Sequence, residues 1–194
     1  MLSLFFATQN ASKIKEVAPL LDDIIRLRSI KELGCTESLP EPEDNLKGNS
    51  FRKAEYIHKH YGVDCLAEDT GLFIKSLNGN PGVYSARYAG LPPDQKKNLS
   101  LVLKNMKGKK EREAVFKTVL TLVLNGNYHS FEGEIQGSIL PEPRGHQGFG
   151  YDAIFVPATK NQSFAEMNSS EKEALSHRSR AVWAMRSFLE REIL

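Results

Sequence analysis

The sequence predicts an α/β fold, with a mixed β-sheet, flanking helices and a prominent antiparallel section. Short apolar runs typical of buried strands alternate with segments whose apolar residues recur at helical spacing. From Ala114 onward the pattern changes to alternation with many β-branched residues, which is typical of paired antiparallel strands. The 194 residues, 40% hydrophobic and 26% charged, are enough to bury the core of one domain, which we expect to span residues 1–194.

The chain is expected to begin with a strand, a helix and a second strand. Residues 2–7 are predicted as a buried strand and residues 24–28 as the second one. The helix between them carries its apolar residues on one stripe, and Asn10 or Ser12 is suited to cap it. Pro19 is expected to end or kink this helix, because proline lacks the backbone donor.

A loop, a helix and a divided apolar segment follow. Residues 34–50 hold several carboxylates between glycines and prolines and are predicted as a loop. Residues 51–61 have helical periodicity, and Gly62 is expected to stop that helix. Residues 63–74 are predicted as two strands, because the polar residues 68–71 interrupt the apolar run.

The second half is expected to contain a helix and a long hairpin. The turn-rich residues 78–93 precede a predicted helix over residues 94–106. Strands are predicted over residues 114–124 and 128–140, and the Asn125-Gly126-Asn127 turn is a good hairpin signal between them.

A short strand and a C-terminal helix complete the prediction. Residues 153–156 form the strand, and Ser170-x-x-Glu173 matches a capping box for the helix. The inward face of this helix is expected to hold Leu175, Val182, Met185 and Leu189. The sequence contains no internal repeat and no linker long enough to separate two independent domains.

The charge balance excludes several function classes. The sum of 26 basic and 24 acidic residues gives a net charge of +2, so no nucleic-acid partner is expected. No apolar run approaches the ~20 residues of a membrane span. The apolar N-terminus lacks the basic region of a secretory signal, and Cys35 and Cys65 form no disulfide framework. A cytoplasmic protein without a membrane partner is therefore expected.

The turn from Thr8 to Lys13 is a candidate phosphate site. A helix N-terminus attracts anions, and Lys13 stands on the unfavourable side of the helix dipole unless an anion is bound there. The alternative is an ordinary capped helix with a solvated lysine. The turn is not a P-loop, because its glycine pattern is absent.

The acidic pair Glu68 and Asp69 is a candidate metal site. Mg²⁺ commonly uses one or two carboxylates together with substrate phosphates, and Glu41, Glu43 or Asp44 could supply the second. The alternative is a surface turn.

The glycine-rich loop 145–152 is a candidate base-binding site. Phe149 and Tyr151 offer ring faces on which a base could stack. The alternative is a tight loop with core aromatic residues.

A basic cluster lies near the start of the last helix. It contains Lys172, His177, Arg178 and Arg180, and arginine is a strong donor to carbonyl and phosphate oxygens. The alternative is a solvated basic face.

These motifs occur in a specific order. The chain contains, in sequence, the segments FATQNASKIKE, LPEPEDNLKGNSFRKA, AEDTGLFI, PGVYSARYAG, GFGYDAIFVP and EKEALSHR. Over its whole length it therefore resembles the inosine/xanthosine triphosphate pyrophosphatase family. The resemblance implies Mg²⁺-dependent hydrolysis of noncanonical purine nucleoside triphosphates (dITP, ITP and XTP) to the monophosphate and pyrophosphate. It also implies a cytoplasmic homodimer whose elongated fold has two lobes around a central nucleotide-binding cleft.

The resemblance also implies roles for individual residues. The phosphate-binding turn would comprise Thr8, Gln9, Asn10, Ala11, Ser12 and Lys13. Asp69 would be the general base and a metal ligand, with Glu68 beside it as the other candidate base and Glu41 as the second metal ligand. The remaining substrate contacts would be Lys53, Thr70, Phe149, Gly150, Tyr151, Asp152, Lys172, His177 and Arg178.

The physical reading gives these residues a mechanism. Lys13 and Lys172 would add positive charge around the phosphates, and Phe149 would stack on the purine. Donors on Arg178 and His177 would select the 6-oxo group over the amino group of adenine.

Three departures from the family pattern stand out. Gln9 replaces a common glycine, and Gly48-Asn49-Ser50 stands where Glu-Asn-Ala is common. The proline spacing leaves open whether Glu41 or Glu43 ligates the metal.

Two other functions stay open: a nucleotide sensor without catalysis, and a hydrolase of a modified pyrimidine triphosphate.

Overall fold

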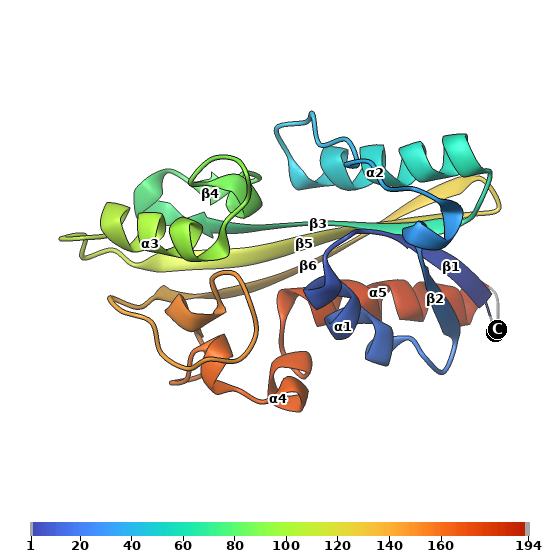
Figure 1. Ribbon diagram of the computed structural model, residues 1–194. Helices are drawn as coiled ribbons and strands as arrows, with labels where there is room; N and C mark the ends of the chain where they lie inside the picture. The colour runs from blue at the N-terminus through green and yellow to red at the C-terminus, as the bar shows by residue number, and fades with distance from the viewer. Residues whose placement is uncertain (1, 193–194) are drawn as a thin grey trace. The chain divides into compact units, whose positions relative to one another are not determined.

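The computed structural model describes residues 2–192 and contains one seven-stranded mixed sheet with flanking helices (Figure 1). The strand order is β2-β1-β3-β5-β6-β7, and β4 pairs with β3. The strands are β1 (Leu2–Ala7), β2 (Ile25–Ser29), β3 (Cys65–Ile74), β4 (Pro81–Gly82), β5 (Glu113–Leu124), β6 (Asn127–Ile139) and β7 (Phe155–Pro157). The helices are α1 (Ala11–Val17), α2 (Leu46–Tyr61), α3 (Gln95–Asn105), α4 (Ser169–Glu173) and α5 (His177–Glu192).

The contacts divide the chain into two compact units. The first unit comprises Met1–Asp69, Thr118–Gly133 and Arg178–Leu194, and the second comprises Thr70–Lys117 and Glu134–His177. Strands β3, β5 and β6 each contribute residues to both units. The predicted mixed sheet with flanking helices is confirmed. The elongated shape, the central cleft and the single domain over residues 1–194 stay predictions, and Met1 and residues 193–194 lie outside the described part.

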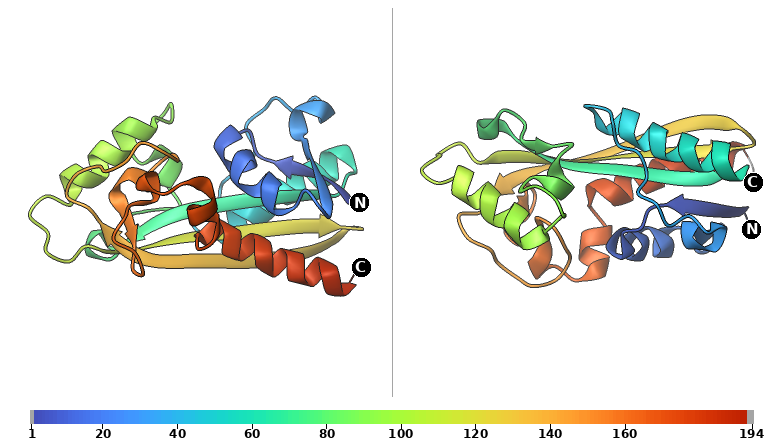
Figure 2. Two further views of the ribbon diagram at one scale, coloured as in Figure 1. Left: turned by 90° about the horizontal axis from the view of Figure 1, so that it is seen from below. Right: turned by 45° about the horizontal axis from the view of Figure 1, so that its top comes forward.

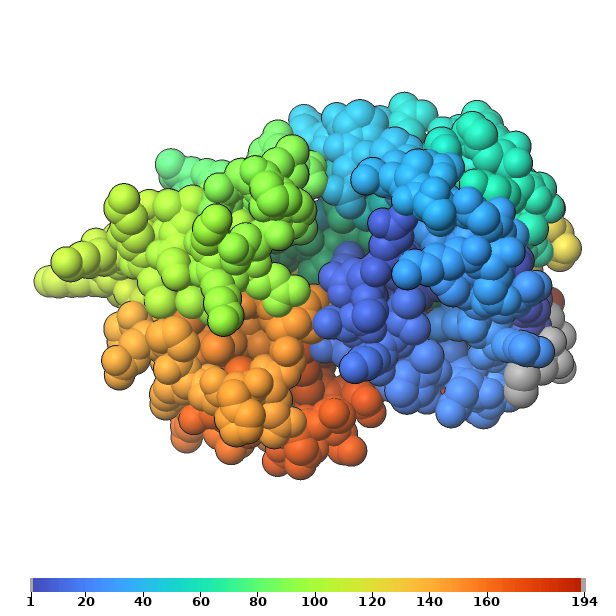
Figure 3. Space-filling view, in the orientation of Figure 1, coloured from blue at the N-terminus to red at the C-terminus, as the bar shows by residue number. Residues whose placement is uncertain are grey.

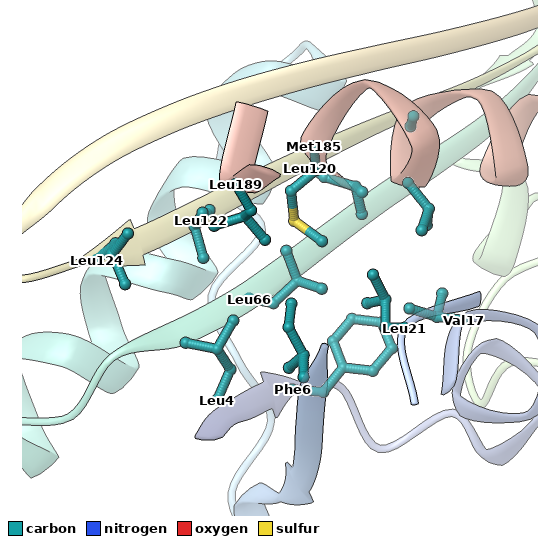
Figure 4. Close-up of a cluster of buried hydrophobic side chains, with 13 residues drawn as sticks. Leu4, Phe6, Val17, Leu21, Leu66, Leu120, Leu122, Leu124, Met185 and Leu189 are labelled. Atoms are coloured by element: carbon teal, nitrogen blue, oxygen red, sulfur yellow. The ribbon is translucent and has the colours of Figure 1, made fainter. Parts of the chain in front are cut away.

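The first unit buries both faces of its sheet. Alternate residues of a strand point to opposite faces. One face packs against α1 and α5 through the core of Figure 4, with members such as Leu4, Phe6 and Leu66. The other face packs against α2, with Ala54 and Ile57 as helix residues of that core. Figure 1 shows α2 on one side of these strands and α1 and α5 on the other, and the left view of Figure 2 shows α5 in front of the strands.

The second unit has a core of its own. Leu72 of β3 and Phe116 of β5 pack with Val102 of α3 and with Phe155 and Phe164. The rings of Phe116 and Phe155 meet edge to face, with centroids 4.7 Å apart. Tyr151 of the glycine-rich loop belongs to this core.

Strand β3 corrects one prediction. Residues 63–74 do not form two strands, because β3 is continuous from Cys65 to Ile74. Glu68 and Asp69 lie buried inside it, at 1% and 6% exposure. A buried carboxylate is tolerated where it has charged partners, and the polar interruption is therefore a charged centre within a strand.

Helix boundaries differ from the sequence prediction at two places. Helix α2 begins at Leu46 instead of residue 51, because the side chain of Asn45 caps it and accepts from the Gly48 amide at 2.7 Å. The capping box is formed by Asn168, which directly precedes α4, and by Glu171 in the first turn of α4. It is not formed by Ser170 and Glu173, as the sequence predicted. The predicted C-terminal helix is consequently two helices, α4 and α5.

Other local predictions are confirmed. Asn10 caps α1, and the α-helix ends at Val17, two residues before Pro19. Asn125 and Gly126 both have positive φ values, 51° and 77°, as a tight hairpin turn requires. Among the described residues, we find no helix with the length and apolar character to cross a membrane.

Candidate active site

The turn after β1 is built by its own side chains. The Asn10 Oδ1 atom accepts from the amides of Ser12 (3.0 Å) and Lys13 (3.4 Å), and Thr8 Oγ1 accepts from the Asn10 amide at 3.1 Å. The sequence predicts Asn10 or Ser12 as the cap of α1, and the structure shows that Asn10 is the cap. Ala11 is exposed. The N-terminal part of the chain, dark blue in Figure 3, lies at the visible surface.

Gln9 ties this turn to a neighbouring loop. Its Nε2 atom donates to the carbonyl oxygens of Thr36 (3.2 Å) and Glu37 (2.9 Å). The Glu37 carboxylate in turn accepts from the hydroxyls of Tyr56 (2.8 Å) and Tyr61 (3.2 Å) of α2. The residue that departs from the family pattern thus holds the candidate phosphate turn against the segment that leads to Glu41.

Successive residues of β3 place two charged clusters on either side of the strand. Glu68 meets partners from α1 and α5, whereas Asp69 meets a partner from α2. The strand period of two explains why neighbours in sequence serve different clusters. Both clusters lie in the first unit.

The first cluster surrounds Glu68. Arg178 donates from Nη2 to Glu68 Oε1 at 2.9 Å and from Nε to Oε1 and Oε2 at 3.0 and 3.1 Å. Its Nη1 binds Glu16, and the ammonium of Lys13 lies 3.5 Å from Glu68 Oε1. Burial alone would lower the pKa of Arg178, but Glu68 and Glu16 raise it above its ordinary value. Burial lowers the pKa of Lys13, and Glu68 opposes that shift.

The second cluster surrounds Lys53 of α2. Its Nζ atom lies 2.8 Å from Glu41 Oε1 and 3.1 Å from Asp69 Oδ1. The other carboxylate oxygen, Asp69 Oδ2, is buried and has no hydrogen-bond partner. Burial raises the pKa of Asp69, while Lys53 opposes the shift. Burial would lower the pKa of Lys53, but Asp69 and Glu41 raise it.

The structure distinguishes between the two candidate metal ligands of the loop. Glu41 shares Lys53 with Asp69. Glu43 instead accepts from Arg52 Nε at 2.7 Å, and its amide binds Asn49. Among the described residues, no three histidine, cysteine or acidic side chains gather as a ready metal site. Of the two loop carboxylates, Glu41 is therefore the one that shares a partner with Asp69.

A third group lies in the second unit, around Asp152. Its Oδ2 atom accepts from Lys172 Nζ at 2.6 Å and from the Phe149 amide at 2.7 Å. The Lys172 ammonium lies 5.3 Å from the centroid of the Phe149 ring. Gly148 has φ 72°, and a Cβ there would stand 2.1 Å from Asp152 Oδ2, so this position requires glycine. Asp152 therefore orients the loop that presents Phe149.

Other predicted substrate contacts also make interactions within the second unit. The Tyr151 hydroxyl donates to the Ser85 carbonyl at 2.8 Å, and burial raises its pKa. The Gly150 amide donates to Gln95 Oε1 at 3.0 Å. The imidazole of His177 stacks on Phe116, with centroids 4.6 Å apart, and Thr70 lies half-buried in β3.

The predicted residues therefore fall into two sets. The first unit holds the turn Thr8–Lys13, Glu41, Lys53, Glu68, Asp69 and Arg178, and the second holds Thr70, Phe149–Asp152, Lys172 and His177. Sequence reasoning missed Glu16. Its spacing from Lys13 was the available signal, since residues three apart on a helix share a face.

Comparisons with known proteins place the chain among close relatives. The Ham1 family model matches residues 4–188. A dITP/XTP pyrophosphatase of Porphyromonas gingivalis is 43% identical over 97% of this chain and 98% of its own length. A dITP/XTP pyrophosphatase of Bacillus subtilis is 39% identical over 98% of each chain. The solved structure of a HAM1 protein from Coxiella burnetii matches with a TM-score of 0.90 at 34% identity, over 98% of this chain and 100% of that one.

Proposed function

Because the chain belongs to the Ham1 family, as the order of its motifs predicts, we propose that it hydrolyses noncanonical purine nucleoside triphosphates. Its substrates are dITP, ITP and XTP, and its products are the nucleoside monophosphate and pyrophosphate. This activity keeps deaminated purines out of DNA and RNA. Its relatives from Porphyromonas gingivalis and Bacillus subtilis carry the name dITP/XTP pyrophosphatase.

One observation carries the chemical part of the proposal. Asp69 Oδ2 is a buried acceptor without a partner, and it belongs to a carboxylate that shares Lys53 with Glu41. Two carboxylates and one ammonium carry a net charge of −1. A buried, unpartnered oxygen in an anionic cluster is costly unless a cation, a proton or a hydrogen-bond donor satisfies it. Oxygen donors of this kind fit Mg²⁺, with phosphate and water oxygens completing the coordination.

Asp69 and Glu41 would hold Mg²⁺, which when bound neutralises phosphate charge and stabilises the charge that develops during transfer. The carboxylate of Asp69 takes the proton from the water that attacks the α-phosphorus, and pyrophosphate leaves. Glu68 suits this role less well, because Arg178 occupies both of its oxygens.

The remaining residues bind and select the substrate. Lys13 and Lys172 supply positive charge to the phosphates, and Phe149 stacks on the purine. Arg178 and His177 are the proposed readers of the 6-oxo group. Arg178 would read the base from a guanidinium that Glu68 and Glu16 hold in place, and His177 from a ring packed on Phe116.

The decisive experiment is a substrate panel. Pyrophosphate release is measured with Mg²⁺ for dITP, ITP, XTP, dATP, dGTP and modified pyrimidine triphosphates. The proposal expects kcat/KM for the deaminated purines to exceed that for dATP by orders of magnitude, because a donor pair facing an amino group loses its hydrogen bonds. Binding of dITP without turnover would support the sensor instead, and preference for a pyrimidine would support the other hydrolase.

Location and assembly belong to the same proposal. We place the enzyme in the cytoplasm as a homodimer that binds neither nucleic acid nor membrane. Light scattering on the purified protein tests the dimer, and a mass equal to one chain of 21.8 kDa would refute it.

A further inference from the structure

Lys53 stands between the two carboxylates that would hold the metal. Its ammonium lies 2.8 Å from Glu41 Oε1 and 3.1 Å from Asp69 Oδ1. The side chain is 6% exposed and reaches the carboxylates from the middle of α2. Lys53 therefore bridges two anions that would otherwise repel one another, the buried Asp69 and the partly exposed Glu41.

An ammonium and a magnesium ion cannot occupy this bridging position together. Mg²⁺ binds its ligands at about 2.0–2.1 Å, closer than the 2.8 and 3.1 Å at which the ammonium stands from Glu41 and Asp69, so the two cations would compete for the same carboxylates. Both cations would also be separated by only a few ångströms in a buried site, where repulsion between like charges is strong. Even where a metal ion binds Asp69 through the unpartnered Oδ2 atom, it would stand next to the ammonium, so we expect its entry to displace Lys53 from the carboxylates.

Once displaced, the Lys53 ammonium needs another anion. A buried charge without a partner is strongly unfavourable. A metal ion that enters alone would leave Lys53 in that state, whereas a triphosphate brings oxygens that accept from the ammonium. The metal and the phosphates thus each make the binding of the other more favourable, which is a positive coupling between two ligands.

We propose that Lys53 takes the place of the divalent cation in the metal-free protein, so that the metal enters together with the nucleotide and not before it. This inference rests on the proposed function and deepens it, because it identifies the metal–nucleotide complex as the species that the site accepts. Lys53 is the residue that makes metal binding depend on phosphate.

The test uses Mn²⁺ as a spectroscopic substitute for Mg²⁺. Electron paramagnetic resonance counts the free Mn²⁺ in solutions of the whole protein, with and without the α,β-methylene analogue of dITP, which cannot be cleaved at the reacting bond. For the wild-type protein we expect weak binding of Mn²⁺ alone and binding at least about tenfold tighter with the analogue, after correction for Mn²⁺ held by free analogue. Equal affinity in the two conditions would overturn the proposal.

Variants separate the charge of Lys53 from its shape. Lys53→Met removes the competing ammonium, so Mn²⁺ alone should bind about tenfold or more tightly than to the wild-type protein. Lys53→Arg keeps a positive charge and should bind Mn²⁺ alone as weakly as the wild-type protein. Lys59→Met is the matched control, because Lys59 lies on the same helix but is 65% exposed and pairs with Glu55. No change of affinity is expected in this control.

Two results would contradict the proposal that Lys53 takes the place of the cation. In the first, Lys53→Met is folded, as circular dichroism shows, but binds Mn²⁺ no more tightly than the wild-type protein. In the second, Lys53→Arg binds Mn²⁺ much more tightly than the wild-type protein. If Lys53→Met does not fold, Lys53→Gln removes the same charge but keeps a polar side chain, and the comparison of Mn²⁺ affinities is made with that variant. The readout is independent of turnover, so failure of the proposed activity in the substrate panel is recognised separately.

Discussion

Arg178 of α5 donates two hydrogen bonds to one carboxylate oxygen of Glu68 of β3, from Nη2 at 2.9 Å and from Nε at 3.0 Å. Both side chains are almost completely buried, at 2% and 0% exposure. The pair joins elements that are 110 residues apart in the sequence, and Glu16 of α1 binds the same guanidinium. Three elements of the first unit are therefore fixed by one buried arginine.

Loss of this arginine should be costly for the fold. Arg178→Met leaves Glu68 and Glu16 without their main partner, and removal of one member of a buried ion pair destabilises a protein by about 3–5 kcal/mol. Urea denaturation measures the change. Arg186→Met on the same helix is the control, because its partner Asp23 is 55% exposed and little stability should be lost. Equal loss in the two variants would contradict a special role for the buried pair.

The same arginine should influence base selection. Arg178→Lys keeps a positive charge but loses the planar fork of donors. We expect the ratio of kcat/KM for dITP over dATP to fall by about tenfold or more, since the discrimination depends on oriented donors. An unchanged ratio in a folded variant would remove Arg178 from the reading of the base.

Phe149 should affect purine binding more than phosphate binding. A base stacked on an aromatic ring gains about 1–3 kcal/mol, so Phe149→Ala should raise KM for dITP by about tenfold or more. Inhibition by tripolyphosphate, which has no base, serves as the control and should stay unchanged. A similar loss for both ligands would show that the substitution disturbs Asp152 and Lys172 instead.

Lys13 predicts an alkaline limit to phosphate binding. Burial lowers the pKa of Lys13, so its charge is lost at a pH below the ordinary lysine value of about 10.4. Because only the ammonium attracts phosphate, KM for dITP should rise as the pH increases through this lowered pKa. Lys13→Arg should move the limit upward, since arginine stays charged. An alkaline limit at the same pH in Lys13→Arg would assign it to another group.

Much of the fold follows from local sequence patterns. Strand β1, the Asn10 cap and the Asn125-Gly126 turn are set by neighbouring residues, and the sequence predicts each of them. The continuous strand β3 could not be predicted from the local sequence. The polar residues at its centre look like a break between two strands until their distant partners are known. Arg178 stands 110 residues away from Glu68, and no local pattern contains that pairing.

The candidate site shows the same division. The sequence alone marks the acidic pair, the turn at Lys13 and the loop at Phe149 as candidate sites, because the chemistry of their residues suits metal, phosphate and base binding. The assignment of Glu41 to the Asp69 cluster and of Glu43 to Arg52 depends on how α2 packs on β3, which the sequence left open. Glu16 was missed because a glutamate on an amphipathic helix is usually solvated.

The central claim is that Asp69 activates water in a pyrophosphatase. Asp69→Asn keeps the shape of the side chain but removes the charge that accepts the proton. The decisive measurement is pyrophosphate release from dITP with Mg²⁺ by this variant, together with its affinity for the uncleavable dITP analogue. We predict a folded protein that binds the analogue and loses nearly all turnover. Release at the wild-type rate would contradict the account.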